Sequence, residues 1–180
     1  MSPQPSPGHE PLTAALDDVG VQARLDHVAV AAARLRDLLP LYRDLLGGRY
    51  LGGGDNPRVG YRACQFGFLE GKIELMEPLA GSSFLDSFLD RGGGMHHVTF
   101  KVDDIEAAIA AARALGYAPT GIYLDDPSWR EAFLHPREAD GVLVQLAQAV
   151  PGYPPSDPGD QTLEDLLAGN GWNGNGEPSP

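Results

Sequence analysis

The chain carries the stretch Asp26-His27-Val28-Ala29-Val30, and a similar stretch, His96-His97-Val98-Thr99-Phe100, places His97 70 residues after His27. Each stretch precedes a segment in which apolar residues recur at helical spacing. Beyond that segment, 47 or 48 residues after the histidine, a strand pattern carries one polar residue of ligand type, Glu74 or Gln145. This repetition predicts two copies of one module, and it sets the architecture before any other pattern is considered.

Each copy has the same predicted order of elements. In the first, apolar residues between Leu35 and Leu46 predict a helix, which Pro40 either kinks or moves to a later start. In the second, Asp103 is predicted to cap a helix with an apolar face that runs from Ile105 to Leu115. Strand, helix and three strands, twice over, is an α+β plan: paired βαβββ modules that form a curved, cleft-bearing sheet.

The modules divide the chain. A single domain is predicted over residues 24–148, with module 1 at 24–80 and module 2 at 95–148. Residues 1–23 have little apolar content and are predicted to be a disordered N-terminal arm. Residues 149–180 are predicted to be a flexible C-terminal tail, whose one amphipathic stretch, residues 163–167, either docks as a helix or stays free.

Composition limits the classes of partner and the compartment. With 13 basic and 25 acidic residues the formal net charge is −12, which argues against nucleic acid or an anionic membrane as a partner. Cys64 is the one cysteine, so no internal disulfide can form, and a reducing compartment is indicated. No apolar run has the length of a membrane span and no signal peptide is evident, so we expect a cytoplasmic protein.

Strand alternation places four polar side chains on one face of the sheet. In the four strand patterns, the apolar neighbours of the polar residues take the side that the helices cover. The polar residues then take the opposite side, and a pseudo-twofold axis would bring them together: His27, Glu74, His97 and Gln145. A single His or Glu in a strand is usually solvated or hydrogen-bonded. The repeat-related placement of all four favours a metal site instead.

The segments that carry these residues also carry a resemblance, from about residue 24 to 148. They are Leu25-Asp26-His27-Val28-Ala29-Val30, Ile73-Glu74-Leu75-Met76-Glu77-Pro78, Gly94-Met95-His96-His97-Val98 and Phe133-Leu134-His135-Pro136 with Gly141-Val142-Leu143-Val144. The chain resembles the vicinal oxygen chelate superfamily, which includes glyoxalase I, bleomycin- and fosfomycin-resistance proteins and extradiol dioxygenases. Within it, the segments look most like methylmalonyl-CoA epimerase.

The resemblance implies a divalent metal ion in a cleft between the modules, held by His27, Glu74, His97 and Gln145. Zn, Mn, Co, Ni and Fe all stay open as its identity. The resemblance also favours His97 over His96 as the ligand, because His97 aligns with His27. It gives His96 and His135 structural roles.

Two departures from the epimerase pattern bear on the chemistry. Epimerases of this kind carry a glutamate where this chain has Gln145, and a second one where the alignment places Arg58. Those two carboxylates are the acid/base pair that moves a proton between the faces of the substrate α-carbon. An amide does not accept a proton at neutral pH and an arginine stays protonated, so the two-base route has no support here.

Three further residues are predicted to line the substrate pocket: Arg58, Trp129 and Arg130. A guanidinium suits a carboxylate or phosphate, and an indole suits a planar surface. For each of the three, an exposed loop position is an equally good interpretation.

The sequence thus favours a metal-dependent isomerase, epimerase or lyase that acts on an oxygen-rich small molecule, an acyl thioester or α-hydroxycarbonyl compound, through a metal-stabilised enolate. Glu74 is the sole ligand carboxylate and so the best candidate for the catalytic base. An Fe(II)-dependent oxygenase and a small-molecule-binding or resistance protein without turnover are the alternatives. A small-molecule substrate is the expected partner, and a homodimer stays open.

Overall fold

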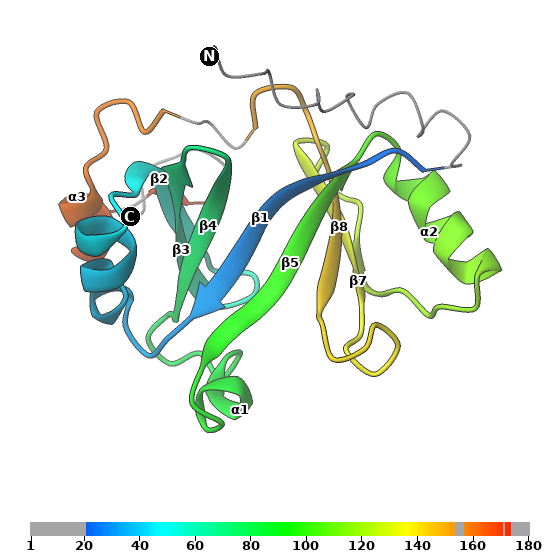
Figure 1. Cartoon of the computed structure of the whole chain (residues 1–180), viewed down its shortest axis with the longest axis horizontal. Helices are drawn as coiled ribbons and strands as arrows, with labels where there is room; N and C mark the ends of the chain where they lie inside the picture. The colour runs from blue at the N-terminus through cyan, green and yellow to red at the C-terminus, as the bar shows by residue number, and fades with distance from the viewer. Residues whose placement is uncertain (1–20, 154–156, 171, 174–180) are drawn as a thin grey trace, which may run out of the picture.

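One mixed sheet forms the body of the molecule and curls into a half-barrel (Figure 1). The computed structural model describes residues 21–153, 157–170 and 172–173, the last two by their backbone alone. Its strands are β1 (Ala23–Ala31), β2 (Arg49–Asn56), β3 (Tyr61–Phe68), β4 (Gly71–Pro78), β5 (Gly94–Val102), β6 (Thr120–Tyr123), β7 (Trp129–Leu134), β8 (Val144–Ala149) and β9 (Trp172–Asn173). They lie in the order β6-β7-β8-β5-β1-β4-β3-β2-β9.

The order of the strands shows the internal repeat. The first strand of each module pairs in parallel with the fourth, β1 with β4 and β5 with β8. The two first strands then pair antiparallel at the centre of the sheet, where they join the modules. The predicted α+β plan of paired βαβββ modules in one curved sheet is confirmed.

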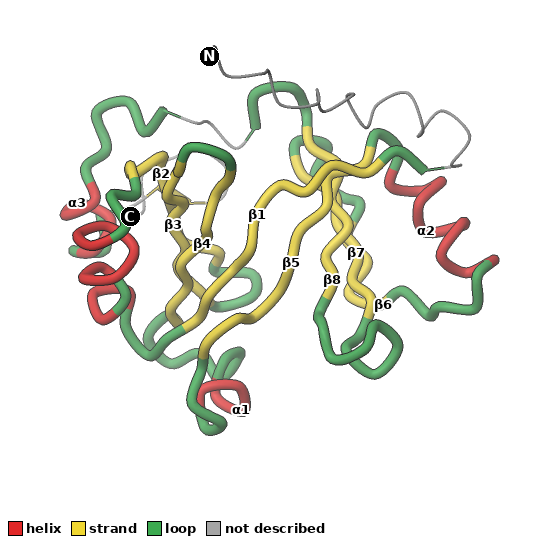
Figure 2. Tube along the Cα trace, in the orientation of Figure 1, coloured by secondary structure: helices red, strands yellow, loops and turns green. Residues whose placement is uncertain are grey.

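The helices lie at the margins of the sheet, as Figure 2 shows. They are η2 (Leu35–Asp37), η3 (Pro40–Leu45), α1 (Asp86–Leu89), α2 (Ile105–Ala114) and α3 (Leu163–Leu167). Pro40 begins the π-helical η3 and so separates it from the 3-10 turn η2, because proline has no N–H to donate within a helix. The prediction of a later start at Pro40 is therefore confirmed. In the described part of the chain, no helix is long and apolar enough to span a membrane.

The cap of α2 lies one residue later than predicted. Asp104, and not Asp103, is the N-cap: its carboxylate accepts from the backbone N–H groups of Glu106 and Ala107, each at 3.0 Å. The carboxylate of Asp103 pairs instead with Arg24 at 2.5 Å. An N-cap needs an extended backbone directly before the first helical residue, and that residue is Ile105.

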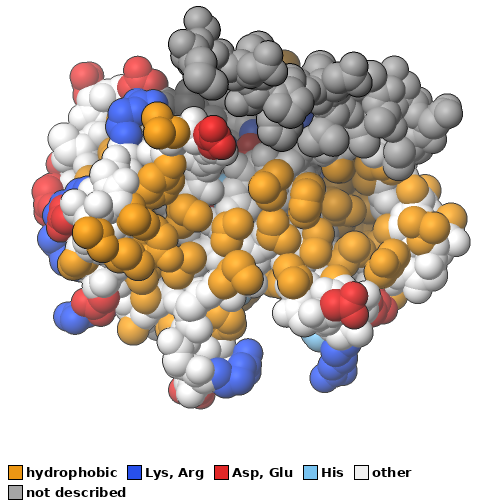
Figure 3. Space-filling view, viewed as in Figure 1, with side chains coloured by type: hydrophobic (Ala, Val, Ile, Leu, Met, Phe, Trp, Pro, Cys, Tyr) orange, Lys and Arg blue, Asp and Glu red, His pale blue; other side chains and the backbone are white. Residues whose placement is uncertain are grey.

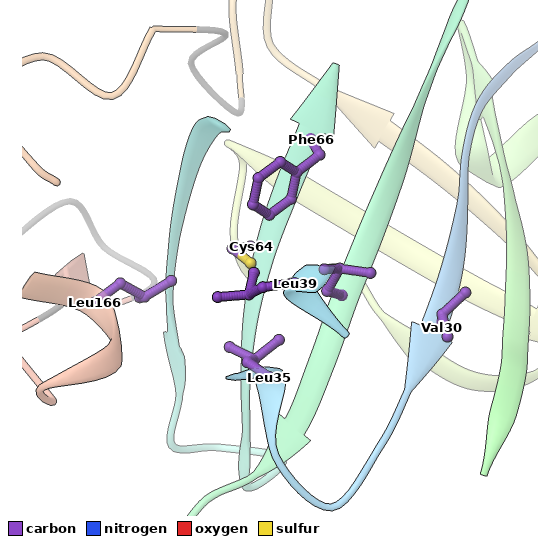
Figure 4. Packing of buried hydrophobic residues seen from close by; sticks show 7 residues of the cluster. Val30, Leu35, Leu39, Cys64, Phe66 and Leu166 are labelled. Carbon is purple, nitrogen blue, oxygen red and sulfur yellow. The ribbon is translucent and has the colours of Figure 1, made fainter. Parts of the chain in front are cut away.

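The larger core cluster lies between the sheet of module 1 and the helices beside it (Figure 4). Its buried members are Val30, Leu35, Leu39, Cys64, Phe66, Leu75 and Leu166. Leu166 belongs to α3, so of the two alternatives for residues 163–167 the structure has the docked helix, Leu163–Leu167. The predicted N-terminal arm falls mostly on residues 1–20, which lie outside the described residues.

Hydrophobic side chains also gather in a band over the central strands on the face seen in Figure 3. Among the residues of these strands, Leu25 of β1 and Met95 of β5 are exposed. Because side chains of a strand alternate between its faces, Val28 of β1 and its partner Val98 of β5 take the face opposite to that of His27 and His97.

Candidate metal centre

Glu74, Ala29 and His97 form one row across the sheet. Ala29 of β1 pairs with Glu74 of β4 on one side and with His97 of β5 on the other. Paired residues of neighbouring strands project from the same face, so the side chains of Glu74 and His97 rise on either side of Ala29. The side chain of Ala29, a single methyl group, takes up little of the space between them.

His27, Thr99 and Gln145 form a second row. His27 pairs with Thr99, and Thr99 with Gln145 of β8. Thr99 follows His97 by two residues, as Ala29 follows His27, so the two are equivalent in the repeat. The fully buried hydroxyl of Thr99 donates to Oε1 of Gln145 at 2.5 Å and lies 3.0 Å from Nε2 of His27. The middle residue of the second row, Thr99, thus hydrogen-bonds to a neighbour in the row, whereas Ala29, in the middle of the first row, has no polar side chain.

The ends of the two rows converge on one point. His27, Glu74 and His97 each offer a ligand atom, and these atoms lie within 4.8 Å of one another. Nε2 of His27 is 3.7 Å from Oε2 of Glu74, and Gln65 of β3 donates to the same oxygen at 3.4 Å. Two imidazoles and one carboxylate are a ligand set that divalent transition metals accept.

His97 offers the clearest sign that the residues fit a metal ion. Its Nε2 is buried and has no hydrogen-bond partner among the described residues, which is unusual for a polar atom away from water. Burial, followed by the nearby His96 and His27, lowers the pKa of His97 to about 3. The ring is therefore neutral. Its Nδ1 lies 2.9 Å from Nδ1 of His96, and in the tautomer in which His97 donates this hydrogen bond, the Nε2 lone pair is free for a cation.

Asp26 holds the other imidazole. Its Oδ2 lies 2.7 Å from Nδ1 of His27, and Lys72 donates to the same oxygen at 2.9 Å. Burial alone raises the pKa of Asp26, but the hydrogen bonds of His27 and Lys72 and the charges of Lys72 and Lys101 outweigh it and bring the pKa well below its ordinary value. An ionised carboxylate on Nδ1 directs Nε2 toward the cluster, as in carboxylate–histidine–metal sites.

Glu131 of β7 is a buried carboxylate that the sequence analysis missed. Only 8% of the residue is exposed, and both of its oxygens accept hydrogen bonds. Arg58 donates to Oε1 at 3.0 Å, while Trp129 Nε1 at 2.9 Å and Gln145 Nε2 at 2.7 Å donate to Oε2. Glu131 thus connects two of the predicted pocket residues to the predicted fourth ligand.

The predicted pocket residues fall on two faces. Trp129 shares a face of β7 with Glu131 and Phe133, whose ring lies 6.5 Å from that of His97. Arg130 alternates to the other face. There it pairs in register with Gln148, which accepts from the first residue of α2. The structure thus brings Arg58 and Trp129 together at Glu131 and places Arg130 on the helix side.

One signal in the sequence could have found Glu131. Ala132 and Leu134 are apolar and Glu131 alternates with them, so the rule that selected Glu74 selects Glu131 as well. Gln65, between Cys64 and Phe66, meets the same rule. Neither residue has a polar counterpart at the matching position of the other module, which is why a search guided by the repeat passes over both.

Comparisons with known proteins agree with this architecture. The family model described as Glyoxalase/Bleomycin resistance protein/Dioxygenase superfamily matches residues 26–133. The mitochondrial methylmalonyl-CoA epimerase of Mus musculus is 36% identical over 134 residues, which cover 70% of this chain and 73% of that protein. The ethylmalonyl-CoA/methylmalonyl-CoA epimerase of Cereibacter sphaeroides is 36% identical over 132 residues, 69% of this chain and 97% of that protein.

A solved structure gives the same result. The methylmalonyl-CoA epimerase of Mycobacterium tuberculosis superposes with a TM-score of 0.65 at 28% sequence identity. The superposition covers 76% of this chain and 93% of the other. The likeness of fold therefore extends over most of this chain.

Proposed function

The chain belongs to the glyoxalase/bleomycin resistance protein/dioxygenase superfamily, and on that premise we propose that it is a metal-dependent isomerase acting on an acyl-CoA thioester. The convergence of His27, Glu74 and His97 within 4.8 Å is the observation that carries the proposal. The names of the relatives in mouse and Cereibacter sphaeroides supply the substrate class, since both are epimerases of malonyl-type CoA esters.

Each side chain of the cluster has a defined task. Nε2 of His27 and Nε2 of His97 would hold a divalent cation, with Asp26 and His96 fixing the two rings from behind. When bound, the cation supplies Lewis-acid stabilisation of negative charge on the substrate oxygens. Its identity stays open among Zn, Mn, Co, Ni and Fe.

Glu74 is proposed to accept the proton. Its side chain is the carboxylate of the cluster, and its Oε2 accepts a long hydrogen bond from Gln65 at 3.4 Å and lies 3.7 Å from Nε2 of His27. The C–H bond at the substrate α-carbon breaks, the proton passes to Glu74, and the electron pair moves to the thioester oxygen to give an enolate. Delivery of a proton from solvent to the opposite face of that carbon gives the epimer, and Glu74 releases the proton it took to solvent.

Glu131 is less suited to this step. Three donors engage its two oxygens, and one of them is the guanidinium of Arg58. Both oxygens of Glu131 are therefore already taken up by donors within the protein, whereas Glu74 lies in the cluster itself.

Proton exchange at the α-carbon tests the proposal directly. Methylmalonyl-CoA is incubated in deuterium oxide with protein loaded separately with each of the five metals, and loss of the α-proton signal is followed by NMR. We expect exchange well above that given by the His97→Ala variant and by buffer alone. Exchange no faster than in these controls, with every metal, overturns the proposal.

A second candidate, binding without turnover, is favoured by one observation. The positions that carry glutamates in the epimerases that the chain resembles hold Arg58 and Gln145 here, and both are engaged by Glu131. The same experiment separates the candidates: a thioester that binds in calorimetry but exchanges no α-proton supports the binding protein.

A further inference from the structure

Glu131 has a place in the site that its burial alone does not explain. It lies on β7, outside the metal-ligand cluster, yet it accepts from Gln145 and from Arg58, which come from different modules. We propose that Glu131 is a positioning residue, which fixes the side-chain amide of Gln145 so that its carbonyl oxygen faces the metal centre. This inference rests on the proposed function in so far as it assigns that oxygen to the metal.

The direction of the Gln145 amide follows from the groups at its two ends. An ionised carboxylate only accepts, so the NH₂ group of Gln145 must face Glu131, at 2.7 Å. The carbonyl oxygen Oε1 must then face the other way, toward Thr99. The hydroxyl of Thr99 donates to it at 2.5 Å and lies 3.0 Å from Nε2 of His27, a ligand atom of the cluster.

In the opposite orientation, the side-chain amide of Gln145 could not act as a ligand of a cation. A flipped amide would aim two N–H donors at Thr99 and His27, and nitrogen of an amide group is not a metal ligand of ordinary proteins. Without Glu131 the two orientations differ only in their contacts with Thr99, whose hydroxyl can donate to the oxygen or accept from the nitrogen. The carboxylate is therefore what selects between them.

Two other donors keep Glu131 itself in place. Trp129 donates to the same oxygen as Gln145, and Arg58 to the other, so the carboxylate plane is held from both sides. A buried charge that is paired and hydrogen-bonded in this way has little freedom to turn. The hydrogen bonds Arg58–Glu131–Gln145–Thr99 are continuous, each 3.0 Å or shorter, and the hydroxyl of Thr99 at their end lies 3.0 Å from Nε2 of His27.

The Glu131→Gln variant tests the inference, because it keeps the size of the side chain and removes the obligate acceptor. Glu70→Gln, at an exposed turn, is the matched control. The first measurement needs no metal: the NH₂ signals of Gln145 in ¹⁵N-labelled protein report its hydrogen bond through chemical shift and solvent exchange. We expect both to change in Glu131→Gln and neither to change in Glu70→Gln.

The second measurement is the affinity for Co²⁺ or Zn²⁺ by calorimetry. Loss of an outer partner of a metal site typically lowers affinity about 10- to 100-fold, and we expect a fall of that order for Glu131→Gln. Unchanged Gln145 signals overturn the inference, as does an unchanged affinity. If the wild-type protein binds no metal, the proposed function fails; the amide signals then decide whether Glu131 orients Gln145.

Discussion

Arg58 and Glu131 form an ion pair of 3.0 Å that joins the two modules. Arg58 lies in the connection between β2 and β3, and Glu131 lies on β7. The guanidinium also stacks on the ring of Tyr123 of β6, 3.8 Å from its centroid. Arg58 is 47% exposed and Glu131 only 10%, by side chain, so water screens the pair and its contribution to stability is at most about 1 kcal/mol. The ion pair matters more for the site, because it holds Glu131, which in turn accepts from Gln145.

Reversal of the charge at Arg58 is predicted to destabilise the protein more than its removal. Arg58→Glu places a second carboxylate opposite Glu131, and we expect a further loss of about 1 kcal/mol relative to Arg58→Ala. The double variant Arg58→Glu/Glu131→Gln removes the repulsion and should recover that difference. Urea denaturation of the three variants measures it. Equal stability of Arg58→Glu and Arg58→Ala would mean that the two side chains do not face each other in solution.

The two neighbouring histidines are predicted to differ in their effect on metal binding. His97→Ala removes a ligand atom and should abolish measurable binding of Co²⁺ or Zn²⁺ in calorimetry. His96→Ala removes only the ring that contacts Nδ1 of His97 at 2.9 Å, so we expect affinity to fall about 10- to 100-fold. His135→Ala, at an exposed position away from the cluster, is the control and should bind as wild type. A larger effect for His96→Ala than for His97→Ala would reverse their roles.

The placement of the three cluster residues on one face of the sheet was predictable from the sequence, because two simple rules give the same result for them. Alternation places His27, Glu74 and His97 on one face, and the repeat puts them at matching positions of two modules. Neither rule depends on packing detail, and the structure brings the three together. Their binding of a metal stays a prediction, as does the ligand role of Gln145.

The partners of these residues were not predictable in the same way. Alternation would turn Asp26 away from the face of His27, but a register shift between Leu25 and His27 lets Asp26 reach the imidazole. A bulge of this kind depends on the pairing of β1 with β5, which the local sequence does not encode. Arg130 was selected as a neighbour of Trp129 in the sequence, although adjacent strand residues face opposite sides.

The position of the N-cap of α2, at Asp104 and not at the expected Asp103, can be tested by substitution. Asp104 accepts two backbone N–H groups of α2, and loss of an N-cap side chain costs about 1 kcal/mol, so Asp104→Ala should destabilise the protein by that amount. Asp103→Ala removes only an exposed pair with Arg24 and should cost less than about 0.5 kcal/mol. Urea denaturation of the two matched variants gives the difference. The reverse order of stability would restore Asp103 as the cap.

The docking of α3 is predicted to contribute substantially to stability, although the tail sequence around it is rich in Pro and Gly. Leu166 is fully buried in the core cluster of module 1, and Thr162 and Asp165 form a capping box that starts the helix beside it. Leu166→Ala should therefore cost about 2–4 kcal/mol in the free energy of unfolding, as for other buried leucines. Leu69→Ala, at a fully exposed turn, makes the same chemical change and should cost less than about 0.5 kcal/mol. Equal effects of the two substitutions in urea denaturation would mean that α3 is undocked in solution, and the boundary of the folded domain would return to residue 148.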